Sequence, residues 1–170
     1  HGDHSDTMGA RDTGWIQIYS EDCQEAYDNF IQAFRIGEHS DVLTPVLVGL
    51  DGFIISHSSE VVQVEDDAAV KKFIGEFKPP YPLLDTSRKF TVGPIDFTDY
   101  YFEHKRSQIE GIENSPRVIE EVGKEFGRTF GRTYGFFEEY RTDDAELCIV
   151  VMSAAAGTGK DAVDELRAEG

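Results

Sequence analysis

The chain has 170 residues, with 33 acidic and 16 basic side chains, and its formal net charge is −17 at pH 7. This length suits one ordinary hydrophobic core, or one domain with a piece of another. Strong negative charge repels nucleic-acid phosphates and anionic lipid head groups, so we expect no nucleic-acid and no membrane partner. The same acidity also fits a salt-rich cytosol or a requirement for solubility. No apolar run approaches the roughly 20 residues that cross a bilayer.

The first part of the chain predicts a strand followed by a helix. Residues 1–14 are small, polar and charged, and predict a loop or a loop that enters a short helix. Residues 15–19 alternate and are rich in β-formers, which predicts a strand, and Ser20 is placed to cap the helix after it. Gly37 is predicted to end that helix in a left-handed conformation. The apolar stripe that predicts burial against a sheet consists of Cys23, Ala26, Tyr27, Phe30, Ile31 and Phe34.

A second strand organises the rest of the chain. Residues 45–50 open with a proline and continue as an apolar, β-branched run, which predicts a strand covered on both faces in a parallel sheet. Asp51 and Gly52 stop it. Because ligands of parallel sheets collect at the carboxyl ends of the strands, we expect residues 51–57 to face a site. Residues 15–53 therefore predict a strand–helix–strand unit.

The middle of the chain alternates between short elements and irregular structure. Residues 61–64 predict a brief extended piece, and a helix is expected from 66 or 67 to about 77. Prolines at 79, 80 and 82 then break the pattern. Residues 83–97 are irregular by composition, and a loop of that length is typically functional or spans a subunit surface.

A long helical stretch is predicted from Thr98 or Asp99, with apolar residues at helical spacing. Two outcomes are open at its centre: Pro116 kinks one helix, or Ser115 caps a second one. A near-duplicate with glycines at 127, 131 and 135 is predicted to end the helix and turn the chain.

The last part of the chain predicts the start of another unit. The acidic residues 138–144 are the best domain boundary, 147–152 predict a second buried strand, and 160–169 predict a helix. A strand and helix need a further strand to complete a parallel crossover, so we expect the chain to be an internal segment of a longer polypeptide.

The residues Gly157-Thr158-Gly159-Lys160 resemble a phosphate-binding loop only loosely. The triphosphate version requires glycine where Ala154 stands and Ser or Thr where Asp161 stands. A tight strand-to-helix turn capped by Thr158 is the favoured interpretation, and a phosphate site remains the alternative.

Cys23 and Cys148 are far apart in the sequence, and no Cys-x-x-Cys or Cys/His cluster has zinc spacing. Each lies within an apolar pattern, so we expect two small buried side chains, with a disulfide as the minor alternative. No metal ligands are predicted.

Arg11 is the candidate binding residue. It lies among small residues in a loop ahead of a strand, where a planar guanidinium suits bidentate binding of a carboxylate. From spacing alone, an ion pair with Asp12 or Asp6 is favoured over ligand binding. His4 and His57 each have hydroxyl or carboxylate neighbours, so they are either acid–base groups or, as we favour, hydrogen-bonded structural histidines.

Five stretches in order, 2–15, 24–26, 50–53, 56–57 and 139–146, resemble the α subunit of pyruvate:ferredoxin oxidoreductases (pyruvate synthases). The resemblance covers nearly the whole chain. It is specific to the 2-oxoacid:ferredoxin oxidoreductase superfamily, and less so to pyruvate within it.

The resemblance implies a thiamine-diphosphate enzyme of anaerobic metabolism that oxidatively decarboxylates a 2-oxoacid with coenzyme A, or catalyses the reverse synthesis. It implies a cytoplasmic location and electron transfer to ferredoxin through [4Fe-4S] clusters on other subunits. Arg11 then contacts the substrate carboxylate, and Thr13 and Asp12 are supporting loop neighbours. Thiamine diphosphate and its Mg²⁺ lie mainly on another subunit or domain, so no residue here is assigned to the cofactor.

The resemblance also implies a domain organisation and partners. Residues 1–140 form the later part of a pyrimidine-side thiamine-diphosphate-type domain with a parallel sheet, and 145–170 begin a transketolase C-terminal-like α/β domain. The partners are β-, γ- and δ-type subunits and a second copy of the chain. Pro116 departs from the family's long helix, with no consequence expected for the site. The alternatives are another 2-oxoacid (branched-chain, 2-oxoglutarate or oxalate) and a non-catalytic assembly segment.

Overall fold

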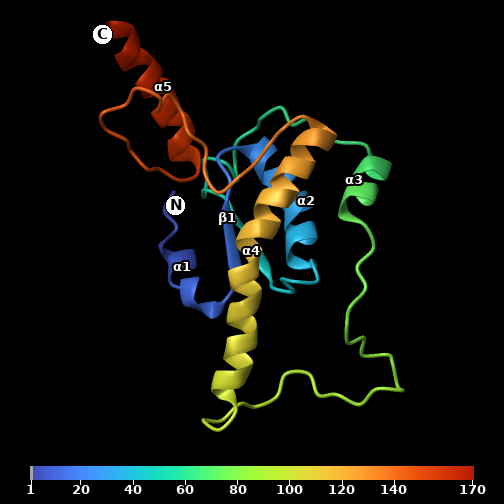
Figure 1. Ribbon diagram of the computed structural model, residues 1–170. Helices are drawn as coiled ribbons and strands as arrows, with labels where there is room; N and C mark the ends of the chain where they lie inside the picture. Colours follow the sequence, from blue (N-terminus) through green and yellow to red (C-terminus); the bar gives the residue numbers. More distant parts are fainter. Residues whose placement is uncertain (1) are drawn as a thin grey trace.

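The computed structural model describes residues 2–170, so residue 1 of the predicted amino-terminal loop lies outside the described residues. Strand β1 (Ile16–Tyr19), helix α2 (Cys23–Gly37) and strand β2 (Val46–Gly49) form the predicted strand–helix–strand unit. The two strands pair in parallel, with Ile16 opposite Val46 and Tyr19 opposite Gly49. The fold is therefore α/β with a small parallel sheet (Figure 1).

The start of α2 differs from the prediction. Asp22, not Ser20, caps the helix, because its carboxylate accepts a 2.7 Å hydrogen bond from the backbone N–H of Glu25. Ser20 is instead fully buried at the end of β1, where its hydroxyl accepts from the Asn29 amide at 3.2 Å.

The apolar stripe of α2 is also only partly the buried face. Ile31 is buried, but Phe30 is 61% exposed and Phe34 46% exposed, and both line an open groove of about 640 Å³ beside β2. For the same reason β2 is not covered on both faces, and only Gly49 of this strand is buried. The buried residues of α2 are Asp28, Asn29, Ile31, Gln32 and Ile36.

Gly37 lies inside α2 and does not adopt the predicted left-handed conformation. Its role is close packing: a Cβ at this position would come within 2.9 Å of the Thr44 carbonyl oxygen. A side chain at Gly37 would push the helix end away from the segment that enters β2.

Helix α3 (Asp67–Ile74) is shorter than predicted. Asp66 caps it by accepting from Ala69 N–H at 3.0 Å, and Gly75 ends it with a φ of 79°, a conformation that other residues rarely adopt. Residues 61–64 form no strand. Residues 83–97 contain no helix or strand, as expected, but 76–77 and 98–100 also lie outside the helices, unlike the prediction.

Helix α4 (Tyr101–Phe130) continues through Pro116, so Ser115 does not cap a second helix. The Ser115 hydroxyl donates to the Ile112 carbonyl at 2.8 Å, the carbonyl that would accept from residue 116 if it had an N–H. Gly131, with a φ of 84°, ends the helix.

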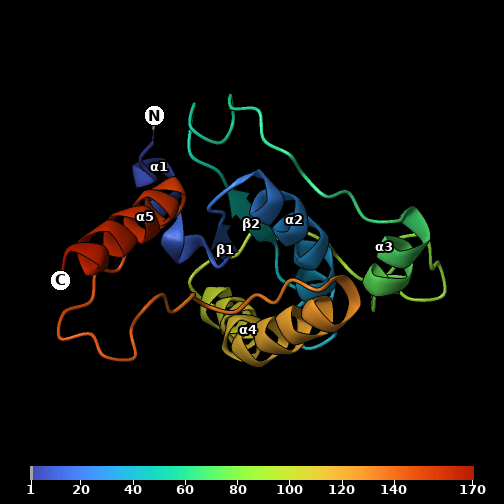
Figure 2. The ribbon, with the colours of Figure 1, turned by 90° about the horizontal axis from the view of Figure 1, so that it is seen from above.

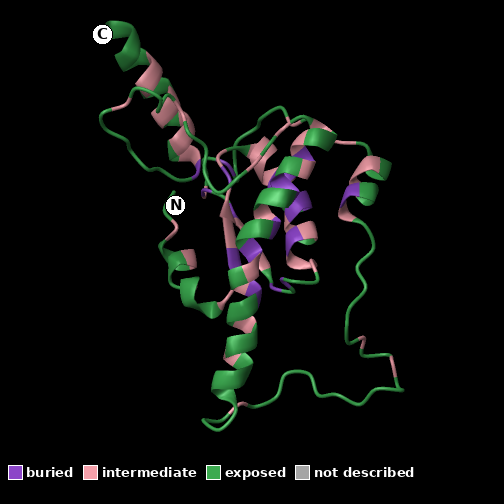
Figure 3. Ribbon diagram, viewed as in Figure 1, coloured by how far each residue is buried: buried purple, intermediate pink, exposed green. Residues whose placement is uncertain are grey.

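The hydrophobic core lies where α4, α2 and α3 meet beside the sheet (Figures 2 and 3). Each element contributes a few apolar side chains, and the aromatic ring of Phe73 packs edge-on against that of Phe126. The buried cluster consists of Ile16, Ile31, Ile36, Val42, Phe73, Val118, Val122 and Phe126.

The carboxyl-terminal part corrects two predictions. Residues 147–152 form no strand, and Leu147 and Val150 are 91% and 97% exposed, since no strand in the described part of the chain lies beside them. Helix α5 (Ala154–Glu169) begins six residues before the predicted position 160. None of its residues is buried, and Figure 1 shows it leaning away from the core.

Candidate functional site

The segment ahead of β1 folds back along that strand. It contains the short helix α1 (Ser5–Met8) and the 3-10 turn Arg11–Thr13, labelled η1. Two side chains of β1 hold it, because the Gln17 amide donates to the Thr7 carbonyl at 3.0 Å and the Tyr19 hydroxyl to Thr7 Oγ1 at 2.8 Å. Arg11 is therefore presented on a segment tied to the sheet.

The η1 turn exposes its guanidinium. The Arg11 side chain is 73% exposed, and its Nε lies 3.7 Å from Oδ2 of Asp12, which is 90% exposed. An ion pair of this kind is weak in water, so it leaves the guanidinium available. Thr13 supports the turn locally, with its hydroxyl donating to the Ala10 carbonyl at 2.6 Å, and Gly14 follows in the left-handed conformation. The turn can present a planar cation to an anionic ligand.

The two regions singled out by the sequence lie at opposite ends of the sheet. Arg11 precedes β1 and so lies at the amino end of the strands, whereas residues 51–57 follow the carboxyl end of β2. The four-residue strands between these two ends are about 13 Å long.

At the carboxyl end, His4 and Asp51 form a buried pair. His4 Nε2 lies 2.6 Å from Asp51 Oδ1, with both side chains less than a tenth exposed. The second oxygen, Oδ2, accepts from the Ala154 N–H at 2.9 Å, at the start of α5. The His4 ring also packs edge-on against Tyr19 at 4.7 Å. These contacts tie α1, β1, β2 and α5 together, as the structural interpretation of His4 expects.

His57 lies apart from this junction. It is exposed, its Nδ1 is 2.7 Å from the Ser56 hydroxyl, and its ring packs against Phe53 at 4.7 Å. The structure therefore does not bring His57 to either His4 or Arg11.

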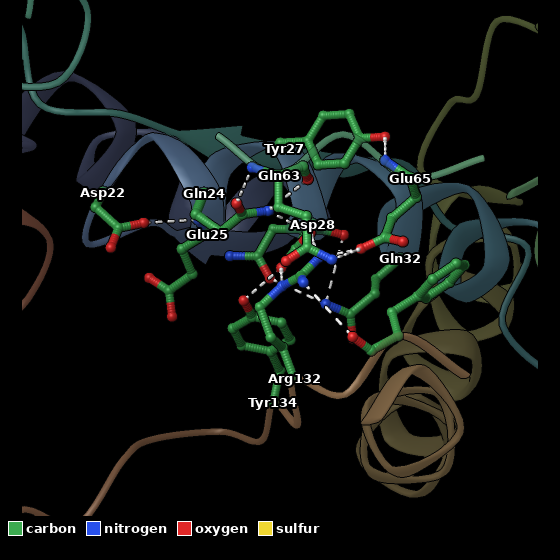
Figure 4. Close-up of polar contacts among 12 residues, drawn as sticks. Asp22, Gln24, Glu25, Tyr27, Asp28, Gln32, Gln63, Glu65, Arg132 and Tyr134 are labelled. Atoms are coloured by element: carbon green, nitrogen blue, oxygen red, sulfur yellow. Dashed lines mark hydrogen bonds and ion pairs between the residues drawn. The ribbon is translucent and has the colours of Figure 1, made fainter. Parts of the chain in front are cut away.

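The sequence reasoning missed a polar cluster around Asp28 (Figure 4). Asp28 is fully buried, and Arg132 donates to both of its oxygens, from Nε at 2.5 Å and from an Nη at 2.9 Å. Tyr134 donates to the same carboxylate at 2.6 Å, and Arg132 also pairs with Glu65 at 2.8 Å. The cluster joins α2, the segment before α3 and the chain after α4.

This cluster shifts two pKa values. Hydrogen bonding to Asp28 raises the pKa of the Arg132 guanidinium, so it stays charged. Burial, followed by the neighbouring Asp28 carboxylate, raises the pKa of the Tyr134 hydroxyl, so it remains a donor. The signal available in the sequence was an Asp among the apolar residues of α2, together with the Arg-Thr-Tyr of the glycine near-duplicate.

The remaining sequence candidates do not form sites. Residues 157–160 lie inside α5, so there is no phosphate-binding turn capped by Thr158. Lys160 pairs with Glu21 at 2.8 Å and Glu138 at 2.7 Å. Burial lowers the pKa of Lys160, but these two carboxylates outweigh it, and the net shift is upward.

Both cysteines are free, and they are not the buried side chains that were expected. Cys148 is exposed and Cys23 is partly exposed. Cys148 belongs to the 147–152 segment, so its exposure follows from the absence of a strand there.

Two parallel strands joined by a crossover helix define an α/β domain, and Arg11 lies on the turn that precedes its first strand. The model of the family described as pyruvate flavodoxin/ferredoxin oxidoreductase, thiamine diphosphate-binding, matches residues 1–124. The chain belongs to this family of thiamine diphosphate-binding domains.

Three curated relatives align with nearly all of the chain. Pyruvate synthase subunit PorA of Thermotoga maritima is 56% identical over 170 residues, covering 100% of this chain and 43% of that protein. PorA of Pyrococcus abyssi is 45% identical over 168 residues, covering 99% and 42%. The α subunit of NADH-dependent phenylglyoxylate dehydrogenase of Aromatoleum evansii is 38% identical over 177 residues, covering 99% and 42%. The chain thus spans less than half the length of these relatives.

Within 2–170, no group of three or more His, Cys, Asp or Glu side chains is placed to ligate a metal ion. In the same residues, no helix is long and apolar enough to cross a membrane.

Proposed function

We propose that this chain is part of a 2-oxoacid:ferredoxin oxidoreductase that converts pyruvate to acetyl-CoA, or runs the reverse synthesis, with ferredoxin as electron carrier. The observation that supports it is the family match over 1–124, joined by 56% identity to a pyruvate synthase subunit. Thiamine diphosphate supplies the decarboxylation chemistry in this proposal, with its Mg²⁺ and the [4Fe-4S] clusters held elsewhere in the assembly.

In this proposal, the chain contributes the binding site for the substrate carboxylate. Arg11 offers a planar fork of donors from an exposed turn, and its 3.7 Å contact with Asp12 is long enough to yield to a ligand. Thr13 keeps the turn closed by donating to the Ala10 carbonyl, and Asp12 is the weak ion-pair partner of the guanidinium when no substrate is bound. We assign Arg11 to substrate binding, with Thr13 and Asp12 as its supports.

The experiment compares Arg11→Ala with wild type in the assembled enzyme, using methyl viologen as the electron acceptor. Charge-assisted hydrogen bonds contribute about 1.5–3 kcal/mol each, so the KM for pyruvate should rise about 10- to 100-fold. Turnover of acetaldehyde, which lacks the carboxylate, should stay near the wild-type value. Arg106→Ala, which removes an arginine that is 53% exposed and lies outside the turn, is the matched control. Equal loss with both substrates would make Arg11 structural.

A different 2-oxoacid is the second candidate function. The 38% identity to a phenylglyoxylate dehydrogenase subunit shows that the same sequence pattern occurs in a relative named for an aromatic oxoacid. Branched-chain oxoacids, 2-oxoglutarate and oxalate belong to the same alternative. Comparing kcat/KM across pyruvate, phenylglyoxylate and these acids decides between them.

The assembly and its location complete the proposal. The relatives are named as subunits, which supports a complex with β-, γ- and δ-type subunits and a second copy of this chain. Coenzyme A and ferredoxin are the other partners, and the cytoplasm is the proposed location. Size-exclusion chromatography of the co-expressed subunits tests the complex, and failure of this chain to co-elute would favour a separate role.

Residues 1–140 and 145–170 are proposed as the later part of a pyrimidine-side domain and the start of a transketolase C-terminal-like domain. The family model ends at 124, and no residue of α5 is buried. Arg167 pairs with Asp144 at 2.6 Å and Arg141 with Asp164 at 2.8 Å, so α5 is held to the 138–144 segment by exposed ion pairs. Limited proteolysis should cut first between residues 138 and 146.

A further inference from the structure

The η1 turn is bound by a side chain from far along the chain. Gln108, in the first third of α4, donates from its amide nitrogen to the Thr13 carbonyl at 2.9 Å. Figure 1 shows α4 passing close to the segment between α1 and β1. Among the described residues, this is the one hydrogen bond that joins Arg11, Asp12 or Thr13 to another element of the fold.

The amide of Gln108 is itself oriented. Lys105, one helical turn earlier, donates from its ammonium group to Gln108 Oε1 at 2.6 Å, and both side chains are partly buried. With the amide oxygen taken by a cation, the amide nitrogen faces the turn as a donor. The pair lies at the i, i+3 spacing that brings helical side chains together.

Gly14 makes this contact possible. A Cβ on Gly14 would lie 2.3 Å from both Cδ and Nε2 of Gln108, and the φ of 87° is already unfavourable for other residues. The bare backbone after Thr13 therefore leaves the space that the amide fills. The turn and the helix are fitted to each other at this point.

We propose that Gln108, oriented by Lys105, is a positioning residue that sets the place of Arg11 for the substrate carboxylate. Arg11 is two residues before the carbonyl that Gln108 holds, in a turn whose other bonds are internal. Rotation of the whole turn would move the guanidinium while all hydrogen bonds within the turn stayed intact. Even a small displacement of a charged group lowers the rate sharply when the group must meet its partner in a fixed geometry. This inference rests on the proposed function of Arg11.

The test uses the assembled enzyme with Gln108→Ala and Gln108→Glu, neither of which can donate to Thr13. The KM for pyruvate should rise about fivefold, the equivalent of one ordinary hydrogen bond, while turnover of acetaldehyde stays unchanged. Ser107→Ala, whose hydroxyl bonds only within the helix, to the Glu103 carbonyl, is the control and should match wild type. Wild-type kinetics in Gln108→Glu would overturn the proposal.

A double variant separates positioning from general stability. If Gln108 acts through Arg11, the pair Arg11→Ala with Gln108→Ala should have the same kcat/KM for pyruvate as Arg11→Ala alone. Independent, multiplicative losses would overturn the proposal. If Arg11→Ala affects both substrates equally, the proposed function of Arg11 fails; if only the Gln108 variants behave like wild type, this inference alone fails.

A readout independent of activity is hydrogen exchange of the peptide 9–16 in the same complex. Gln108→Ala should speed exchange of the turn amides, whereas Arg11→Ala and Ser107→Ala should leave it unchanged, because neither removes a bond to the turn backbone. Unchanged exchange in Gln108→Ala would show that the helix does not hold the turn.

Discussion

The Asp28 cluster gives the sharpest prediction about stability. Asp28→Asn keeps the size of the side chain but removes the charge and replaces one acceptor oxygen with an NH₂ group. In the native chain, that carboxylate accepts from Arg132 at 2.5 and 2.9 Å, from Tyr134 at 2.6 Å and from Gln24 at 3.1 Å. The variant turns an NH₂ group toward some of these donors and leaves them without an acceptor in a buried place.

The magnitude follows from burial. Removing one partner of a buried ion pair costs about 3–5 kcal/mol, because the other charge is left uncompensated. Arg132 is partly exposed and keeps its 2.8 Å pair with Glu65, which places the expected loss near the lower limit, about 3 kcal/mol. This loss is a large fraction of the total stability of a typical domain.

The assay is urea denaturation of the purified full-length protein, with Asp41→Asn as the matched control. Asp41 also pairs with an arginine at 2.6 Å, but both it and Arg117 are about half exposed, so its loss should cost less than about 1 kcal/mol. Equal effects of the two substitutions would refute the claim that burial gives the Asp28 pair its importance.

Two further predictions concern the chain after α4. Above the ordinary tyrosine pKa of 10.0, residue 134 loses its proton in the unfolded chain but keeps it in the native state, so the free energy of unfolding should fall as pH rises past 10. Tyr134→Phe should remove this pH-dependent fall, as measured by urea titrations at pH 9 and 11. Gly123→Ala would place a Cβ 2.0 Å from the Tyr134 carbonyl oxygen and should cost about 1–3 kcal/mol, whereas Gly135→Ala, with nothing nearer than 3.8 Å, should leave the urea midpoint unchanged.

The strand–helix–strand unit could be predicted because its signals are local. Apolar periodicity in α2 and the β-branched run of β2 lie within short windows, and a parallel connection between neighbouring strands needs a helix of this kind. The same local signals misplaced the buried face of α2. Asp28 is buried because Arg132 and Tyr134, more than 100 residues later, provide its partners. No local window contains that information.

The 147–152 segment shows the converse error. Its apolar run is typical of a buried strand, yet a strand is stable only when neighbours complete its hydrogen bonds and cover its faces. In the described part of the chain the sheet consists of β1 and β2, and neither pairs with this segment. The composition of the segment favours a strand, but a strand forms only if a neighbouring strand pairs with it.

The position of Arg11 was predicted from the sequence, whereas its role in substrate binding stays a prediction. Small residues around Arg11 indicated an exposed guanidinium, and the structure places it on such a turn. Gln108 could not be found from the sequence, because a glutamine on an exposed helical face resembles any other polar surface residue. The proposed positioning role of Gln108 depends on its contact with Gly14, which lies 94 residues earlier in the sequence.

If Gln108 positions Arg11 as proposed, continuity of α4 through Pro116 also matters for the proposed site. Beyond Pro116, α4 is held by Val118, Val122 and Phe126, and nearer to Gln108 it is held by the buried Gly111 and by Asn114, whose amide donates to the Asp41 carbonyl at 3.1 Å. An unbroken helix joins both sets of contacts to Gln108. Because the Ser115 hydroxyl satisfies the Ile112 carbonyl, the helix passes the proline without losing that hydrogen bond.

Ser115→Ala should then loosen the Arg11 turn as well as the helix, so faster hydrogen exchange in peptide 9–16 should accompany faster exchange in 101–112. Faster exchange in 101–112 alone would show that the turn does not depend on α4.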